Sequence, residues 1–213
     1  MKKEGVSVLH QCIYNLIHAD VSGELACHTR HKLKYRRRPK HKRFPIADRT
    51  SIHLHPGQAD GKRFGDFEMD LIVDAHKHAI LSIEERSTNM LFMTKLAHGK
   101  KSEPLAKAVR RLLLPYKKHI KTITTDNGPE FAAHKLITKY LGAVVYFADP
   151  YASWQKGAIE NTNKLIRQYI PKQANFNDFT DKKIASIQKE INSRPRQKLR
   201  FETLKAEFFK RIA

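Results

Sequence analysis

Three acidic residues lie in segments where a carboxylate is unusual, because a charge in a half-buried element is costly unless something compensates it. Asp70 lies mid-way along a segment of alternating apolar residues, on the face opposite to them. Asp126 ends a short β-branched segment, and Asn127 and Gly128 after it predict a sharp turn. Glu160 lies 34 residues further on, on the polar side of a helical pattern. Carried by separate elements, the three carboxylates can meet at one edge of a sheet.

Carboxylates from three elements suit the binding of two divalent metal ions. Mg²⁺ prefers hard oxygen ligands, and one or two carboxylates per ion suffice when phosphate and water complete the shell. Two ions about 3.5–4 Å apart stabilise the attacking and leaving oxygens of an in-line displacement at phosphorus. The pattern predicts a site for two Mg²⁺ or Mn²⁺ ions at Asp70, Asp126 and Glu160. Glu68, on the same strand face as Asp70, is the leading candidate for an accessory ligand.

Each acid also has a plainer interpretation when it is taken alone. A strand aspartate is more often an edge or turn residue, an Asp-Asn-Gly sequence is usually only a turn, and a helical glutamate is usually solvated. Asp74 and Asp149 also lie close to these segments, and we interpret them as structural residues. The catalytic interpretation therefore depends on the three acids occurring together.

The elements that must position these acids follow the order β-β-β-α-β-α-β-α, with a further pair of helices at the end. Period-2 alternation and turn residues predict five strands, at residues 65–73, 78–83, 89–96, 121–125 and 143–147. Three antiparallel strands followed by alternating helix and strand predict an α/β fold, with a five-stranded mixed sheet flanked by helices. This order matches the ribonuclease H-like fold. We expect residues 61–213 to form this core and residues 1–60 to form a basic appendage.

The charge predicts a nucleic-acid partner. Lys and Arg number 41 against 21 Asp and Glu, a net charge of +20, and such a field attracts polyanions. Residues 30–43 hold nine Lys or Arg in fourteen positions, which predicts an extended basic arm that contacts phosphates; a merely solvated charge run is the alternative. The candidate DNA contacts in this arm are Arg36, Arg37, Arg38, Lys40, Lys42 and Arg43. Lys164 and Arg167, on the same helix face as Glu160, are candidates beside the metals.

Other classes of protein are disfavoured by what the sequence lacks. No apolar run approaches the roughly 18 residues that a membrane helix needs, and no signal segment opens the chain, so we expect a cytoplasmic protein without a membrane partner. Cys12 and Cys27 cannot form a disulfide framework in a chain of this length. Their spacing to His28 and His31 suits no standard zinc finger.

Three segments that carry the acids resemble the IS-thirty family of bacterial insertion-sequence transposases, relatives of retroviral integrases. They are GDFEMDLIV, TTDNGPEF and DPYASWQKGAIENTNKLIRQYIPK, and the tail INSRPRQKLRFETLKAEFF resembles the closing segment of the same family. The resemblance covers roughly residues 60–213. It implies a DDE triad at Asp70, Asp126 and Glu160 that cleaves and joins DNA strands with two metal ions. It further implies a protein that acts near the nucleoid and forms a homo-oligomer on double-stranded DNA.

The same resemblance assigns supporting roles around the triad. Asn127 and Gly128 shape the turn of the second acid, and Asn127 is also a candidate DNA contact. Asn161, Lys164 and Arg167 support the metals or hold DNA ends. Residues 150–157 correspond to a flexible active-site loop. We expect Trp154 in that loop to be a core residue, because large aromatic side chains are usually mostly buried, and a base-stacking wedge is the alternative.

The sequence also departs from the family pattern. Phe67 stands where the family usually has Trp, and Leu204 where it usually has Pro. Members normally carry an N-terminal helix-turn-helix module, whereas this chain starts almost at the linker, which predicts a catalytic fragment or a decayed remnant. A catalytically silent remnant that binds DNA or full-length transposase is the alternative function. A nuclease or resolvase of another ribonuclease H-like kind is disfavoured by the integrase-type loop at residues 149–161.

Overall fold

The computed structural model describes residues 8–29, 46–57, 59–150 and 152–213, and divides the chain into two units, Met1–Pro45 and Ile46–Ala213. The first unit contains helices α1 (His10–Ala19) and α2 (Glu24–Cys27), neither of which has a buried residue. Residues 46–60, expected in the appendage, belong to the second unit. The candidate DNA contacts of the basic arm lie outside the described residues: Arg36, Arg37, Arg38, Lys40, Lys42 and Arg43.

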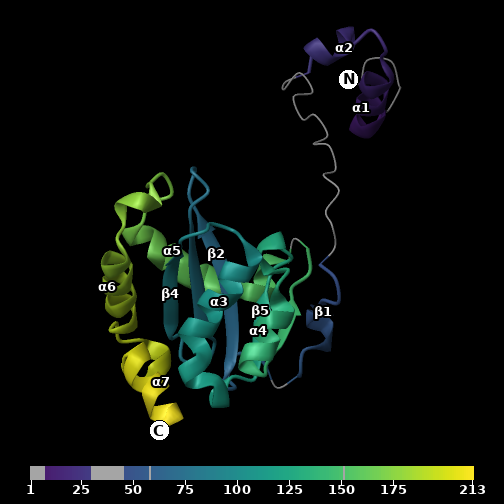
Figure 1. Cartoon of the computed structure of the whole chain (residues 1–213). Coiled ribbons are helices and arrows are strands. Elements are labelled where there is room, and N and C mark those ends of the chain that lie inside the picture. Colours follow the sequence, from purple (N-terminus) through teal and green to yellow (C-terminus); the bar gives the residue numbers. More distant parts are fainter. Residues whose placement is uncertain (1–7, 30–45, 58, 151) are drawn as a thin grey trace. The chain divides into compact units, whose positions relative to one another are not determined.

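The second unit is built on a mixed sheet with the strand order β1-β6-β5-β2-β3-β4 (Figure 1). The strands are β1 (Thr50–Ser51), β2 (Asp66–Val73), β3 (Ala79–Glu85), β4 (Leu91–Leu96), β5 (Thr122–Thr125) and β6 (Val144–Phe147). β2, β3 and β4 pair in antiparallel fashion, whereas β5, β6 and β1 continue the sheet in parallel from β2. The expected α/β fold and its five strands are confirmed. The sixth strand, β1, was not expected, because two residues are too few to show alternation.

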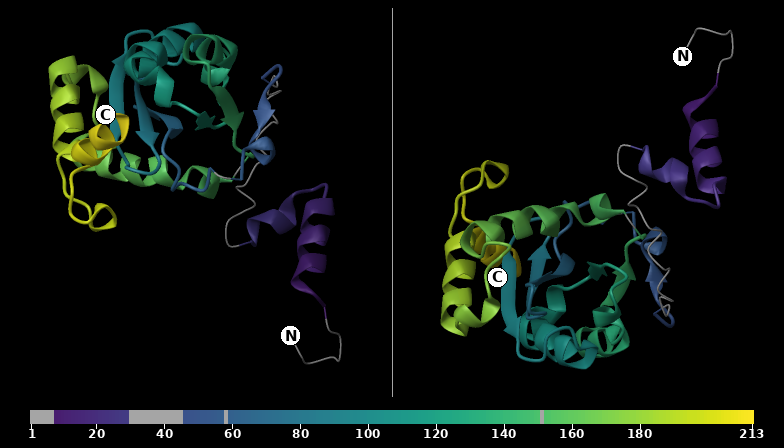
Figure 2. Two further views of the ribbon diagram at one scale, coloured as in Figure 1. Left: turned by 90° about the horizontal axis from the view of Figure 1, so that it is seen from below. Right: turned by 90° about the horizontal axis from the view of Figure 1, so that it is seen from above.

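Helices cover both faces of the sheet (Figure 2). Helices α3 (Ser102–Leu113) and α4 (His134–Leu141) bury one hydrophobic cluster, to which β2 contributes Phe67 and Met69. Helices α5 (Gly157–Tyr169) and α6 (Asp181–Asn192) bury a second cluster, to which β2 contributes Ile72. Successive strand residues point to opposite faces, so Glu68 and Asp70 share the face of Ile72, on the α5 side.

Side chains of α6 cover the free edge of β4. Asn192 is buried, and its side chain accepts a hydrogen bond from the backbone N–H of Leu91 (2.9 Å) and donates one to the Leu91 carbonyl (2.8 Å). Gln188 accepts from the N–H of Met93 at 2.7 Å. Unpaired backbone groups on an edge strand otherwise invite pairing with another chain. Thr180 begins α6 as its N-cap, accepting from the N–H of Lys183.

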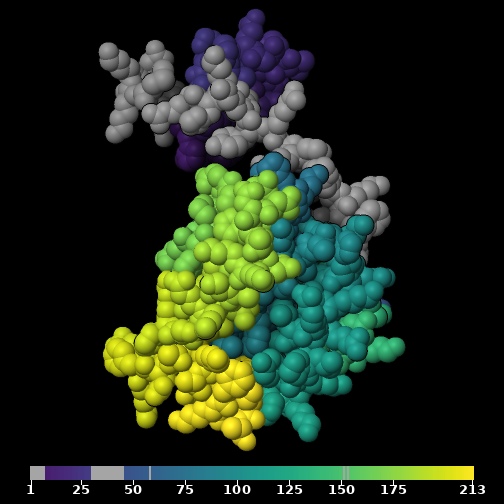
Figure 3. Space-filling view, turned by 60° about the vertical axis from the view of Figure 1, so that its left-hand side comes forward, coloured from purple at the N-terminus to yellow at the C-terminus, as the bar shows by residue number. Residues whose placement is uncertain are grey.

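The last helix, α7 (Leu204–Ile212), is fixed by aromatic packing. Phe208 is fully buried, and its ring centroid lies 5.2 Å from Tyr116, 5.4 Å from Phe64 and 5.5 Å from Phe92. In the space-filling view the yellow C-terminal helix lies directly against the teal part of the core (Figure 3). The C-terminal segment is therefore part of the folded unit.

Candidate active site

Asp70 and Asp126 come from neighbouring strands. β2 and β5 run parallel with Glu68 opposite Thr124, and Asp70 and Asp126 each lie two residues beyond these paired positions. β5 ends at Thr125, so Asp126 is the first residue beyond the strand. Polar residues at the carboxyl ends of parallel strands gather at one edge of a sheet, where α/β proteins build their sites.

A buried lysine joins the two aspartates. Lys156 Nζ lies 3.2 Å from Asp70 Oδ1 and 3.7 Å from Asp126 Oδ2. The lysine side chain is 7% exposed, against 21% for Asp70 and 46% for Asp126. The two carboxylates therefore already share one cation, which belongs to the chain itself.

Asn163 of α5 holds the other oxygen of Asp70. Its Nδ2 donates to Asp70 Oδ2 at 2.8 Å, and its Oδ1 accepts from Ser82 Oγ of β3 at 2.9 Å. Burial raises the pKa of Asp70, the ammonium of Lys156 opposes this rise, and the neighbouring Asp126 adds to it. Asp70 is thus positioned from two sides, by α5 and by the loop before it.

Glu160 lies beside this pair rather than within it. It lines a cavity of about 510 Å³ together with Asn163, Lys164 and Arg167, so it shares that cavity with the residue that bonds Asp70. Among the described residues no three Asp, Glu, His or Cys side chains converge closely enough to hold a metal ion. The structure brings Asp70 and Asp126 together, and it leaves the carboxylate of Glu160 in the adjoining cavity.

Glu68 is engaged inside the protein. It is 1% exposed; its Oε2 accepts from the N–H of Ile159 at 2.9 Å and its Oε1 lies 2.9 Å from Arg86 Nε. Burial raises its pKa, and these two contacts oppose the rise. Because both oxygens have partners and Glu68 does not line the cavity, this geometry differs from that of an accessory ligand. Glu68 anchors the first turn of α5 to β2.

The turn after Asp126 is fixed by its neighbours. Asp126 Oδ1 accepts from the N–H of Gly128 at 2.9 Å, and Asn127 bonds the carbonyl of Ala148 and the guanidinium of Arg49. A Cβ at Gly128 would lie 2.6 Å from the carboxyl carbon of Glu130, so any larger residue there requires the Glu130 side chain to shift. Asn127, expected to shape this turn and to contact DNA, has both side-chain polar groups engaged within the chain.

The expected DNA contacts on α5 differ in exposure. Lys164 and Asn161 are exposed, and Lys164 Nζ lies 3.4 Å from Asn161 Oδ1. Arg167 is half-buried, with Nη2 donating to the carbonyl of Val73 at 3.3 Å and its guanidinium over the ring of Phe176. Lys164 is therefore the freer of the two cations beside Glu160.

One prediction about the loop before α5 is wrong. Trp154, expected in the core, is 77% exposed. Gln155 holds the loop instead: its Oε1 accepts from the N–H of Asp149 at 2.7 Å and its Nε2 donates to Asp149 Oδ2 at 2.9 Å. Sequence reasoning also missed Lys156 and Asn163. For Asn163 the available signal was its spacing, three residues after Glu160, which places it on the same helix face. Lys156 is the N-cap residue before the helix, so no such spacing applied to it.

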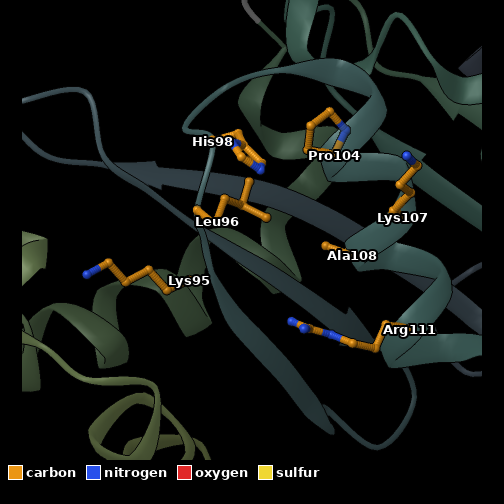
Figure 4. Close-up of a pocket in the computed structure, with 8 residues that line it drawn as sticks. Lys95, Leu96, His98, Pro104, Lys107, Ala108 and Arg111 are labelled. Atoms are coloured by element: carbon orange, nitrogen blue, oxygen red, sulfur yellow. The ribbon is translucent and has the colours of Figure 1, made fainter.

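A second cavity, of about 300 Å³, lies where β4 ends beside α3 (Figure 4). Lys107 and Arg111 rise from α3 beside it, whereas Lys95 points away from them. No carboxylate lines this cavity, so it cannot hold the metal ions that the three acids suggest. It is a basic surface separate from the pair of aspartates.

Three antiparallel strands, then alternating helix and strand, with one aspartate on β2 and a second directly after the adjacent β5, give the fold of an integrase-type core of the ribonuclease H-like class. Among solved structures the chain is similar to the catalytic core domain of BIV integrase, with a TM-score of 0.54 over 70% of this chain and 95% of that one, at 17% identity. No family model matches the sequence. In the part of the chain that the structure describes, no helix has the length and apolar character needed to cross a membrane.

Sequence relatives narrow this class. The chain is 41% identical to the transposase for insertion sequence element IS4351 of Bacteroides fragilis, over 96% of this chain and 65% of the relative. It is 33% identical to the transposase for IS1086 of Cupriavidus metallidurans, over 93% and 61%, and 33% identical to transposase InsI for IS30A of Escherichia coli, over 83% and 46%. The chain is therefore similar, over most of its length, to insertion-sequence transposases related to IS30, as its motifs suggested. It spans between about half and two thirds of these relatives' length.

Proposed function

We propose that this chain is the catalytic part of a transposase that cleaves and joins DNA strands, with Asp70, Asp126 and Glu160 as its metal-binding carboxylates. The observation that carries the proposal is the pairing of Asp70 and Asp126 with one shared cation. Similarity to the insertion-sequence transposases supports the same chemistry. The substrate is double-stranded DNA, at the element's ends and at the target.

The donor set fits divalent magnesium or manganese. Asp70 and Asp126 offer hard carboxylate oxygens, and the space between them already accommodates a positive group. Glu160, one turn after Lys156, completes the set when its side chain turns from the adjoining cavity toward the aspartates. When bound, two such ions stabilise the attacking and leaving oxygens of the displacement at phosphorus.

Residues of the chain itself orient the reaction. Before a metal ion binds, Asn163 and Lys156 hold the two oxygens of Asp70, so that this carboxylate is kept in one orientation. Lys164 and Arg167, in the cavity with Glu160, offer positive charge to the phosphates of a DNA strand that passes beside it. Assembly as a homo-oligomer on DNA and recognition of the element's ends belong to the same proposal.

Substitution of Asp126 tests the proposed chemistry. Asp126→Asn removes one anionic ligand and should abolish nicking and joining of end-containing oligonucleotides in Mg²⁺ or Mn²⁺. DNA affinity should stay equal or rise, because one repulsive charge is lost. Asp178→Asn, at an exposed acid that ends the 3-10 helix Phe176–Asp178, is the matched control and should retain full activity. Retention of cleavage by Asp126→Asn would remove the metal site from the proposal.

A second candidate function is DNA binding without chemistry. The observation that favours it is that Glu160 does not converge with the two aspartates among the described residues. A metal titration separates the two candidates: DNA binding with no cleavage in either Mg²⁺ or Mn²⁺ supports the second, and cleavage that depends on metal concentration supports the first.

A further inference from the structure

Lys156 is a buried cation whose two partners are both acids of the proposed metal site. Its Nζ lies within 3.2 Å of Asp70 and 3.7 Å of Asp126, with 7% of the side chain exposed. Lysine is almost never buried unless its charge is paired, because removing an ammonium from water costs several kcal/mol. Here the two carboxylates supply the compensation. The lysine in turn offsets the repulsion between the carboxylates.

The backbone around Lys156 delivers this side chain inward. Lys156 is the N-cap residue of α5, with φ −124° and ψ 39°, so it lies at the junction between loop and helix. The loop behind it is held by the two hydrogen bonds between Gln155 and Asp149. The helix ahead of it is held by the bond from Ile159 N–H to Glu68. The stem of Lys156 therefore begins from a point fixed on both sides.

We propose that Lys156 is the resident counter-ion of the Asp70–Asp126 pair and competes with a divalent metal ion for the same two oxygens. This inference rests on the metal-dependent function proposed above. A metal ion that bridges the two carboxylates requires the ammonium to leave, and the four-carbon stem of lysine allows it to swing away. The metal affinity of the site is then lower than its carboxylates alone would give.

The competition has a thermodynamic signature that a merely structural lysine lacks. Removing the ammonium leaves two acids without their partner, which destabilises the protein when no divalent ion is present. The same removal takes away the competitor and strengthens metal binding, because a ligand that binds only the lysine-free arrangement no longer has to displace the lysine. One substitution thus changes stability and metal affinity in opposite directions.

The test uses the full chain without DNA and Mn²⁺ as the probe. Lys156→Met keeps most of the stem and removes the charge, Lys156→Arg keeps the charge, and Lys182→Met is a matched control at an exposed lysine of α6. Isothermal titration gives the Mn²⁺ Kd, and thermal unfolding with and without Mn²⁺ gives Tm. Lys156→Gln enters the same series if Lys156→Met fails to fold.

Lys156→Met should have a lower Tm than the wild type without divalent ions and a Kd for Mn²⁺ about tenfold tighter, a gain of about 1.4 kcal/mol. Lys156→Arg and Lys182→Met should keep the wild-type Kd. Equal Kd values for Lys156→Met and the wild type overturn the inference and leave the proposed function intact. If neither protein binds Mn²⁺, the proposed function fails, and this inference fails with it.

Discussion

Glu84 gives a quantitative prediction about the stability of the core behind the site. It is fully buried on β3, directly opposite Glu68 of β2. Burial raises the pKa of Glu84 to about 7 from the model-compound value of 4.5, and the charge of Glu68 adds to the rise. Hydrogen bonds from Asn89 and Thr162 oppose it without cancelling it. Two carboxylates therefore face each other, and Glu84 is the one that takes up a proton near neutral pH.

The sign of the pH dependence follows from the raised pKa. The folded protein holds the Glu84 proton more tightly than the unfolded chain, so the stability that the protonated group contributes is complete below about pH 4.5. It is lost as the pH rises toward 7. A difference of about 2.5 pKa units, at 1.36 kcal/mol per unit, corresponds to about 3 kcal/mol. Glu84→Gln, which resembles the protonated acid and does not titrate, should escape this loss.

Urea unfolding of both proteins at several pH values measures the effect. The free energy of unfolding of Glu84→Gln minus that of the wild type should rise by about 2 to 3 kcal/mol between pH 5 and pH 8. Taking this difference cancels the titration of all other groups. Glu202→Gln, at an exposed acid, should show a difference that does not change with pH. A pH-independent difference for Glu84→Gln would refute the reasoning, because Glu84 would then titrate alike in both states.

Three further predictions concern packing and DNA contacts. Phe208→Ala empties the aromatic cluster of α7 and should lower the free energy of unfolding by about 3–5 kcal/mol in urea titrations; a loss below 1 kcal/mol would contradict that packing. Trp154→Ala should change the free energy of unfolding by no more than about 0.5 kcal/mol, since the side chain is exposed. If the ring stacks on a base, the same substitution should weaken fluorescence-detected binding of unpaired DNA ends by about 1–3 kcal/mol. Lys164→Ala should reduce the slope of log affinity against log salt concentration by about 1, and an unchanged slope would exclude a phosphate contact. Lys107→Ala on α3, at a basic surface away from the aspartates, is the variant with which Lys164→Ala is compared.

Elements with strong local signals could be predicted from the sequence. β2 was visible in its alternation, and α3 in its apolar spacing and the proline of its first turn. Gly142, which has φ 73° and follows α4, predicts the end of this helix from the sequence alone. β1 could not be predicted, because its two residues become a strand only by pairing with β6, nearly a hundred positions away. The same pairing explains why residues 46–60 belong to the second unit.

The candidate site shows the same division between local and long-range information. The turn at Asp126 and the odd placement of Asp70 are local features, so both residues could be selected from the sequence. Lys156 and Asn163 reach Asp70 across 86 and 93 positions, and nothing near them in the chain predicts those contacts. The burial of Trp154 was predicted wrongly, because the average burial of tryptophan side chains does not tell whether one in a loop packs into the core. In this loop the hydrogen bonds are made by the next residue, Gln155.

One face of β2 explains how α5 is held relative to the aspartates. On the face toward α5, Glu68 fixes the N–H of Ile159 and Asp70 fixes the side chain of Asn163. Glu160 lies between these two attachment points, so its backbone cannot shift along the strand without breaking at least one of them. In the proposed function, the carboxylate of Glu160 would turn toward Asp70 through its side-chain torsions, while these two attachments keep its backbone in place.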